Sequence, residues 1–195
     1  MRRLMLLRHA KTESDAPSGR DQDRRLDNRG RQDAADIGGW IGRHPAFFPV
    51  LVLVSHAIRA HQTWEIAWEA MKNGVPEPQV ELMPELYGAD PAQILAAVRS
   101  SSAAGSQRLM VIGHNPGMHE LALALAGSGD AAAGKALAGN LPTSGLAILD
   151  FAVDDWADVA FRRGRLVLFV SPKLLKQTSG ESASRSLRRQ NLFLC

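Results

Sequence analysis

The chain has 195 residues, 45% of them hydrophobic and 22% charged, which is typical of one ordinary globular domain with a substantial core. Its single cysteine, Cys195, cannot form an internal disulfide or a zinc-thiolate cluster, and this favours a reducing, cytoplasmic compartment. No apolar run approaches the roughly 18 residues of a membrane span, so we expect no membrane association. The apolar stretch Leu4 to Leu7 ends at Arg8 and His9, so we interpret the opening MRRLMLLRHA as a buried strand and not as a secretory leader.

Charge is distributed unevenly along the chain. Residues 159–195 carry a net charge of +7, whereas residues 1–158 carry −4. We expect one domain over residues 1–176 and a basic, flexible, Ser/Gly-containing tail over residues 177–195. Nucleic-acid binding is disfavoured, because no aromatic residues alternate with the basic ones to provide stacking platforms.

Short uninterrupted runs of Val and Leu predict strands that are buried on both faces. They lie at Leu4 to Leu7, Val50 to Val54, Leu109 to Ile112, Leu146 to Phe151 and Leu166 to Val170. Helical patterns lie between them, at Asp27 to Ile41, Arg59 to Met71, Pro91 to Val98 and Pro116 to Leu125. This alternation predicts an α/β three-layer sandwich, with a mostly parallel central sheet and helices on both faces. The last two strands are joined by a polar stretch without a long helix and are expected to form an antiparallel edge.

Polar residues directly follow three of the predicted strands. Ligands of open α/β sheets bind beyond the carboxyl ends of the strands, so these residues are the best candidates for a site. They are Arg8 and His9 after the first strand, Ser55, His56 and Arg59 after the second, and Gly113, His114 and Asn115 after the third. Three strand ends thus deliver two arginines and two or three imidazoles to one edge of the sheet.

Two guanidinium groups that converge need an anion between them, and their planar donors match phosphate oxygens. A neutral imidazole in line with the phosphorus can attack it to form a phosphohistidine. The charges of Arg8 and Arg59 would keep His9 neutral, and His114 would donate to a phosphoryl oxygen in the transition state. Each residue alone has a commoner structural explanation, so the hypothesis depends on their combination.

The motifs LLRHAKTE (Leu6 to Glu13), SHAIRAHQT (Ser55 to Thr63) and VIGHNPG (Val111 to Gly117) resemble, in order and spacing, the signatures of the histidine phosphatase superfamily, also called phosphoglycerate mutase-like. The RHAK form, the segment RRLDNRGRQDA and the GHNPG form are most similar to its SixA-like phosphohistidine phosphatase branch. The resemblance covers residues 3 to about 172. It implies that His9 is the nucleophile, that Arg8 and Arg59 bind phosphate, and that His114 is the second catalytic histidine. Ser55 and Asn115 are further candidates for phosphate binding.

Two residues, His56 and Glu85, allow more than one interpretation. His56 stands where the family usually has proline; it either lines the pocket or, the interpretation we favour, is a turn residue exposed to water. The segment PELYG places Glu85 where many members of the family have a general acid. SixA-like members are thought to need no strong acid, because a protonated imidazole is already a good leaving group. Glu85 is therefore either a proton donor or a solvated carboxylate.

The covering of the site bears on the substrate. Only 28 residues separate Glu85 from His114, too few for a large helical lid, so we expect an open site. An open site admits a phosphorylated side chain of another protein. We therefore expect a phosphatase that removes phosphate from protein phosphohistidine through a phosphohistidine enzyme intermediate. The alternatives are a phosphatase of small phosphomonoesters and a non-catalytic phosphate-binding module.

Other chemistries fit less well. The segment Gly129 to Ala136 has the spacing of a P-loop but has Ala136 where a Ser or Thr should bind magnesium. The pairs His56/His61 and His114/His119 are each five residues apart, which does not place either pair on one helical face as metal ligands. Arginines at the same edge would also repel a cation. We expect no metal and no cofactor; the oligomeric state is left open.

Overall fold

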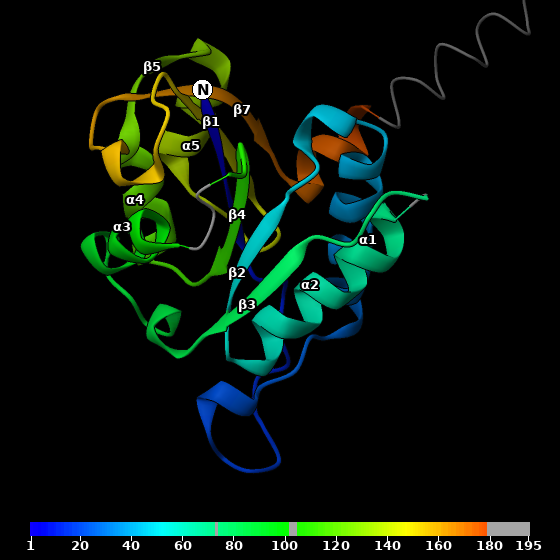
Figure 1. Ribbon diagram of the computed structural model, residues 1–195. Helices are drawn as coiled ribbons and strands as arrows, with labels where there is room; N and C mark the ends of the chain where they lie inside the picture. Colours follow the sequence, from blue (N-terminus) through cyan, green and yellow to red (C-terminus); the bar gives the residue numbers. More distant parts are fainter. Residues whose placement is uncertain (73, 102–104, 179–195) are drawn as a thin grey trace, which may run out of the picture.

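The computed structural model describes residues 1–72, 74–101 and 105–178. Its centre is a seven-stranded sheet with the strand order β3-β2-β4-β1-β6-β7-β5 (Figure 1). The strands are β1 (Arg2–Arg8), β2 (Leu51–Ser55), β3 (Gln79–Met83), β4 (Arg108–Gly113), β5 (Ala126–Gly129), β6 (Leu146–Phe151) and β7 (Gly164–Val170).

Strand direction divides the sheet into two parts. The strands β1 to β4 are parallel to one another, whereas β6 is antiparallel to both β1 and β7. The short strand β5 joins the far edge, parallel to β7. The predicted sandwich with a mostly parallel sheet and an antiparallel part is therefore confirmed. The carboxyl ends of β1, β2 and β4 lie side by side, because these strands are neighbours in the sheet.

Helices cover both faces of the sheet (Figure 1). One face packs against α1 (Asn28–Gly42) and α2 (Ile58–Met71), and the other against α3 (Pro91–Ser100), α4 (Gly117–Leu125) and α5 (Ala131–Gly139). Side chains alternate across β1, so Met5 and Leu7 join the first core, whereas Leu4 and Leu6 join the second. All four are at most 1% exposed, which explains why the run contains no polar residue.

Helix starts follow the capping residues in the sequence. The Asp27 side chain accepts a hydrogen bond from the Gly30 N–H at the start of α1. Asp90 and Gln93 form a capping box at α3, with Pro91 in the first turn. All five predicted strands and all four predicted helices are present, with ends shifted by a few residues.

The strands β3 and β5 and the helix α5 were not predicted. The outer strand β3 lies at the edge of the sheet, and its residues Gln79, Val80 and Glu81 are exposed or half-exposed. Its sequence QVELM therefore has no continuous apolar run. The strand β5 has the sequence AGSG, which contains no strand-forming residue. It pairs with β7, and its Gly127 lies so close to the backbone of Arg162 that a Cβ atom would come within 1.9 Å of the carbonyl oxygen. Tertiary contact, not local preference, makes this strand.

The C-terminal part of the chain lies on the α1 side. Residues 172–178 are helical, and Leu175 packs against the core beneath α1 and α2. Of the predicted tail over residues 177–195, only Gln177 and Thr178 fall within the described residues, and both belong to this helical turn. In the part of the chain that the structure describes, no helix has both the length and the apolar composition of a membrane span.

Candidate active site

The ends of β1 and β4 bring two histidines together. Arg8 pairs with Gly113 in the parallel ladder, and the His9 N–H donates to the Gly113 carbonyl at 3.1 Å. The rings of His9 and His114 lie next to each other, with their centroids 5.0 Å apart and their planes tilted by 52°. Both side chains are buried, at 9% and 7% exposure. The expected convergence of the two strand ends is present.

The His9 ring has a defined tautomer. Its Nδ1 lies 2.7 Å from the Ala10 carbonyl oxygen, which can only accept, so Nδ1 carries the proton and Nε2 is the basic nitrogen. The pKa of His9 is lowered to about 4, mainly by burial and to a smaller extent by the charges of Arg59, Arg8 and Arg24, against the opposing hydrogen bond to Ala10. The sequence argument relied on the arginine charges alone, whereas burial is the larger cause. His9 is therefore a neutral imidazole at neutral pH.

His114 is held by Ser55. The Ser55 Oγ lies 2.7 Å from the His114 Nε2, and Ser55 is fully buried at the end of β2. The His114 Nδ1 is also buried and has no hydrogen-bond partner among the described residues. Burial lowers the pKa of His114 to about 3, with smaller contributions from His9 and Arg59. The Ser55 oxygen thus orients His114, and the ring keeps one nitrogen for another ligand.

Arg59 lies in the first turn of α2, the helix that follows β2, and its guanidinium is buried with 8% of the side chain exposed. It donates from Nη1 to the Asp21 carbonyl at 2.6 Å and from Nη2 to the Asp21 Oδ2 at 2.8 Å. Tyr87 donates its hydroxyl to the same Oδ2 at 2.8 Å, and its ring stands edge-on to His114 at 5.5 Å. The Arg59 Cζ atom lies 5.7 Å from the centre of the Tyr87 ring.

The site therefore has two layers, which we name by their residues. The floor consists of the buried groups His9, Ser55, Arg59 and His114. The rim consists of the more accessible groups Asp21, His56, Glu85 and Tyr87. The rim comes from the short helix η1 (Asp21–Asp23) between β1 and α1, from the turn between β2 and α2, and from the turn that follows β3.

Arg8 and Asn115 meet at one backbone oxygen. The Arg8 Nη1 and the Asn115 Nδ2 both donate to the Leu141 carbonyl, at 3.0 and 2.9 Å. The Arg8 Nε and the Asn115 Oδ1 are buried without a hydrogen-bond partner among the described residues. The Ser144 N–H, in the turn before β6, donates to the carbonyls of Arg8 and His9. The Arg8 charge acts on His9, and burial lowers the pKa of Arg8 itself.

Glu85 and His56 lie on the rim in different ways. Glu85 is exposed on η3 (Pro84–Leu86), directly after β3 and at the same edge of the sheet as the floor. His56 is half-buried: its Nε2 lies 3.2 Å from the Gln22 Oε1, and its ring packs edge-on against Tyr87 at 5.6 Å. The interpretation of His56 as a water-exposed turn residue is therefore wrong, because this contact with Tyr87 makes it part of the rim.

Sequence reasoning did not identify Asp21 and Tyr87 as site residues. Tyr87 had a signal, since it belongs to the PELYG segment that drew attention to Glu85. Arg24, whose charge acts on His9, starts the RRLDNRGRQDA segment. Asp21 had no signal, because it follows no strand and belongs to no quoted motif.

The other histidines face elsewhere. His61 lies 3.7 Å from Glu65 on α2, and the His119 Nε2 lies 2.7 Å from the Leu137 carbonyl oxygen. Within residues 1–72, 74–101 and 105–178, no three His, Cys, Asp or Glu side chains gather as a possible metal site.

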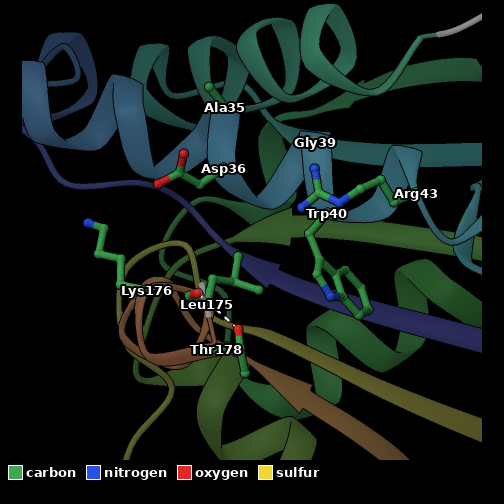
Figure 2. A pocket seen from close by; sticks show the side chains of 8 residues that line it. All are labelled: Ala35, Asp36, Gly39, Trp40, Arg43, Leu175, Lys176 and Thr178. Carbon is green, nitrogen blue, oxygen red and sulfur yellow. Dashed lines mark hydrogen bonds between the residues drawn. The ribbon is translucent and has the colours of Figure 1, made fainter. Parts of the chain in front are cut away.

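A separate pocket lies between α1 and residues 172–178. Figure 2 shows Asp36 and Trp40 of α1, with Arg43 directly after it, facing Leu175, Lys176 and Thr178 across it. Its volume is about 370 Å³, but none of its lining residues belongs to the floor or the rim. Lys176 is paired with the buried Asp33 at 2.8 Å, so this cation serves to attach the C-terminal helical turn.

Comparison with known proteins agrees with the motifs. Residues 4–89 match the family model of the histidine phosphatase superfamily, branch 1. An uncharacterized protein of Mycobacterium leprae is 35% identical over 176 residues, which cover 86% of this chain and all of that protein.

Two solved structures are similar in both sequence and fold. The proposed phosphohistidine phosphatase SixA of Nakamurella multipartitia is 29% identical with a TM-score of 0.73, covering 88% of this chain and 96% of its own. The corresponding protein of Agrobacterium tumefaciens is 32% identical with a TM-score of 0.69, covering 88% of this chain and 98% of its own. The chain belongs to the histidine phosphatase superfamily and is SixA-like within it. This membership supports phosphatase activity.

Proposed function

We propose that this protein is a metal-independent phosphatase that forms a phosphohistidine on His9 and acts on phosphohistidine in another protein. The observation that carries the proposal is the state of His9. Its Nδ1 is bound to the Ala10 carbonyl, its Nε2 is unprotonated, and its ring lies next to that of His114, with the centroids 5.0 Å apart. This is the arrangement that a nitrogen nucleophile requires.

The surrounding groups suit a phosphoryl substrate. Arg8 and Arg59 both supply positive charge near His9, and each lowers its pKa. The His114 Nδ1 and the Arg8 Nε, which is a donor, are buried without a hydrogen-bond partner among the described residues, and an oxyanion in the site would satisfy both. We assign phosphate binding to Arg8, Arg59 and His114. Ser55 would contribute indirectly, because its Oγ is hydrogen-bonded to His114. Asn115 would contribute beside Arg8, because both side chains donate to the Leu141 carbonyl.

The reaction proceeds in two displacements. The lone pair of the His9 Nε2 attacks phosphorus as the bond from phosphorus to the substrate nitrogen breaks, and the electron pair leaves with the substrate imidazole. That imidazole departs as a neutral group when its second nitrogen carries a proton, so little acid catalysis is needed. Water then attacks the phosphorylated His9, and inorganic phosphate leaves with the His9 nitrogen restored.

The form of the rim favours a protein substrate. Glu85 is exposed, and Asp21 keeps 49% of its side chain accessible although it is bonded to Arg59. A phosphorylated side chain of another protein can approach a floor that has such an accessible rim. Phosphohistidine is the intermediate of phosphotransfer signalling, and we propose that this protein acts there, in the cytoplasm.

The test is turnover of three substrates by the purified protein with and without EDTA: phosphoimidazole, a phosphohistidine-carrying phosphotransfer protein, and p-nitrophenyl phosphate. We expect EDTA-insensitive phosphate release, with the highest kcat/KM for the phosphotransfer protein. Loss of activity in EDTA would contradict metal independence. A preference for p-nitrophenyl phosphate would favour a small-molecule phosphatase, and tight phosphate binding without turnover would favour a binding module.

A further inference from the structure

Asp21 occupies an unexpected position against the proposed phosphate-binding group. It lies on η1, which is 38 residues away from Arg59 in sequence, yet it takes two of the guanidinium's hydrogen bonds. One goes to its main-chain oxygen at 2.6 Å and one to its carboxylate at 2.8 Å. Because the donors are Nη1 and Nη2, Asp21 binds the outer end of the guanidinium.

Asp21 is itself held firmly. The Tyr87 hydroxyl donates to Oδ2 at 2.8 Å, and the Arg24 Nη1 donates to Oδ1 at 3.1 Å. The hydrogen bond from Tyr87, followed by those from Arg24 and Arg59, holds the pKa of the Asp21 carboxyl far below its usual range. The carboxylate is therefore charged at every pH at which the protein would work. Its charge also reaches His114, whose pKa it raises against the larger effect of burial.

We propose that Asp21 is a positioning residue for Arg59, a role that rests on the proposed function. A guanidinium has five N–H donors. With one Nη1 and one Nη2 hydrogen on Asp21, the edge formed by Nε and the second Nη2 hydrogen remains for the phosphoryl group. That edge is a fork of two parallel donors, which suits bidentate binding of phosphate oxygens. Asp21 thus sets which edge of Arg59 meets the substrate.

The competing idea is that Asp21 takes the place of the phosphoryl group and must leave before substrate binds. A carboxylate bound to an arginine resembles a bound phosphate chemically, so competition between Asp21 and the phosphoryl group is a reasonable alternative. However, the departure of Asp21 would break its bonds to Arg59, Tyr87 and Arg24, including the bond to its main-chain oxygen. We therefore favour positioning, and the two ideas predict opposite effects on phosphate affinity.

The experiment measures inorganic phosphate binding by calorimetry, together with kcat and KM for phosphoimidazole, in Asp21→Ala and Asp21→Asn. We expect both substitutions to weaken phosphate binding, because Arg59 loses its alignment. For Asp21→Ala the loss should lie between about tenfold and about a hundredfold. The matched control is Asp23→Ala on the same short helix. The Asp23 carboxylate is bonded to Ser18 and Arg20 and not to the floor, so this variant should bind phosphate as the wild type does. The melting temperature of each variant reports its folding.

A mutant cycle with Arg59→Ala shows whether Asp21 acts through Arg59. In the Arg59→Ala background, Asp21→Ala should add little further loss, because the residue that it positions is gone. Tighter phosphate binding by Asp21→Ala would overturn positioning in favour of competition. Wild-type affinity in both Asp21 variants would overturn any role, and fully additive losses would mean that Asp21 meets the substrate directly. If the wild-type protein binds no phosphate, the proposed function itself fails; if it binds phosphate and Asp21 has no effect, only this inference fails.

Discussion

The floor and the rim of the site are built on different principles. The floor groups His9, Ser55 and His114 stand at the ends of neighbouring parallel strands, and Arg59 lies in the first turn of the helix after β2. They are buried, and burial changes their chemistry by lowering the pKa values of His9 and His114. The rim groups Asp21 and Glu85 lie on short helical turns between larger elements, and they remain accessible.

From this difference we expect the floor to govern the chemical step and the accessible rim to govern the choice of substrate. In the floor, His9 has a defined tautomer, and the buried His114 Nδ1 has no hydrogen-bond partner among the described residues, which suits bond making at one phosphorus atom. The rim has hydrogen bonds between side chains from distant segments, such as Tyr87 to Asp21, which fix the shape of the entrance. Substitutions in the floor should therefore stop the reaction on every substrate. In the rim, substitution of Glu85 should change the ranking of substrates, whereas substitution of Asp21 should act on phosphate binding through Arg59.

The largest effect is expected for His9→Ala. Without the nucleophilic nitrogen, turnover of phosphoimidazole and of p-nitrophenyl phosphate should both fall to background. The matched control is His61→Ala, which removes an exposed histidine of α2 and should leave the rate unchanged. Near-normal turnover by His9→Ala, measured as phosphate release, would remove His9 from the chemistry.

Arg59→Ala should come next. The loss of a buried charged fork is expected to cost about 3 kcal/mol or more in kcat/KM, and phosphate binding should weaken in parallel. Arg43→Ala provides the control, because Arg43 lines the pocket of Figure 2 and not the site. A similar loss in both variants would mean that the effect is one of stability, which melting temperatures would reveal.

The third prediction concerns pH. His9 should titrate near its lowered pKa of about 4 and not near the ordinary value of 6.5, so the nucleophile stays neutral as the pH falls to about 5. NMR of the His9 ring, assigned by its loss in His9→Ala, measures this directly. A histidine that is harder to protonate when folded also favours the unfolded state in acid. The free energy of unfolding should therefore fall as the pH drops from about 6.5 toward 4. In His9→Gln this decrease in the free energy of unfolding should be smaller. Titration of the ring near 6.5 would contradict the buried floor.

The smallest effect is expected for Glu85→Gln. On phosphohistidine the rate should change little, because imidazole leaves without a strong acid, whereas on an alkyl phosphate, whose alkoxide is a poor leaving group, it should fall further. The comparison of kcat/KM for the two classes of substrate in one variant is the measurement. Equal losses on both classes would assign Glu85 a role common to every substrate.

The position of the floor was predictable because its residues directly follow buried, neighbouring strands. Uninterrupted apolar runs such as Leu4 to Leu7 predict buried parallel strands. The residues that directly follow such strands lie at one edge of the sheet. The tautomer of His9 and the contact of Ser55 with His114 were not predictable, since they depend on rotamers that only packing decides.

The rim and the outer strands were harder to predict for a related reason. Asp21 reaches Arg59 through a turn with no periodic pattern, so no spacing rule applies to it. The strand β5, with its sequence AGSG, forms only because β7 and the backbone of Arg162 lie beside it. His56 was misjudged because its partner Tyr87 comes from a segment 31 residues further along the chain. In each case, contacts between distant segments outweigh local preference.

The central claim is that the His9 Nε2 carries the phosphoryl group during turnover. The most direct measurement is rapid quenching of the wild-type protein with phosphoimidazole at alkaline pH, followed by mapping of the phosphorylated residue by mass spectrometry. We predict a single acid-labile, alkali-stable phosphohistidine at His9, formed and consumed at rates that match turnover, and absent from His9→Ala. A phosphate bound to another residue, or turnover with no phosphoenzyme at any quench time, would contradict the account.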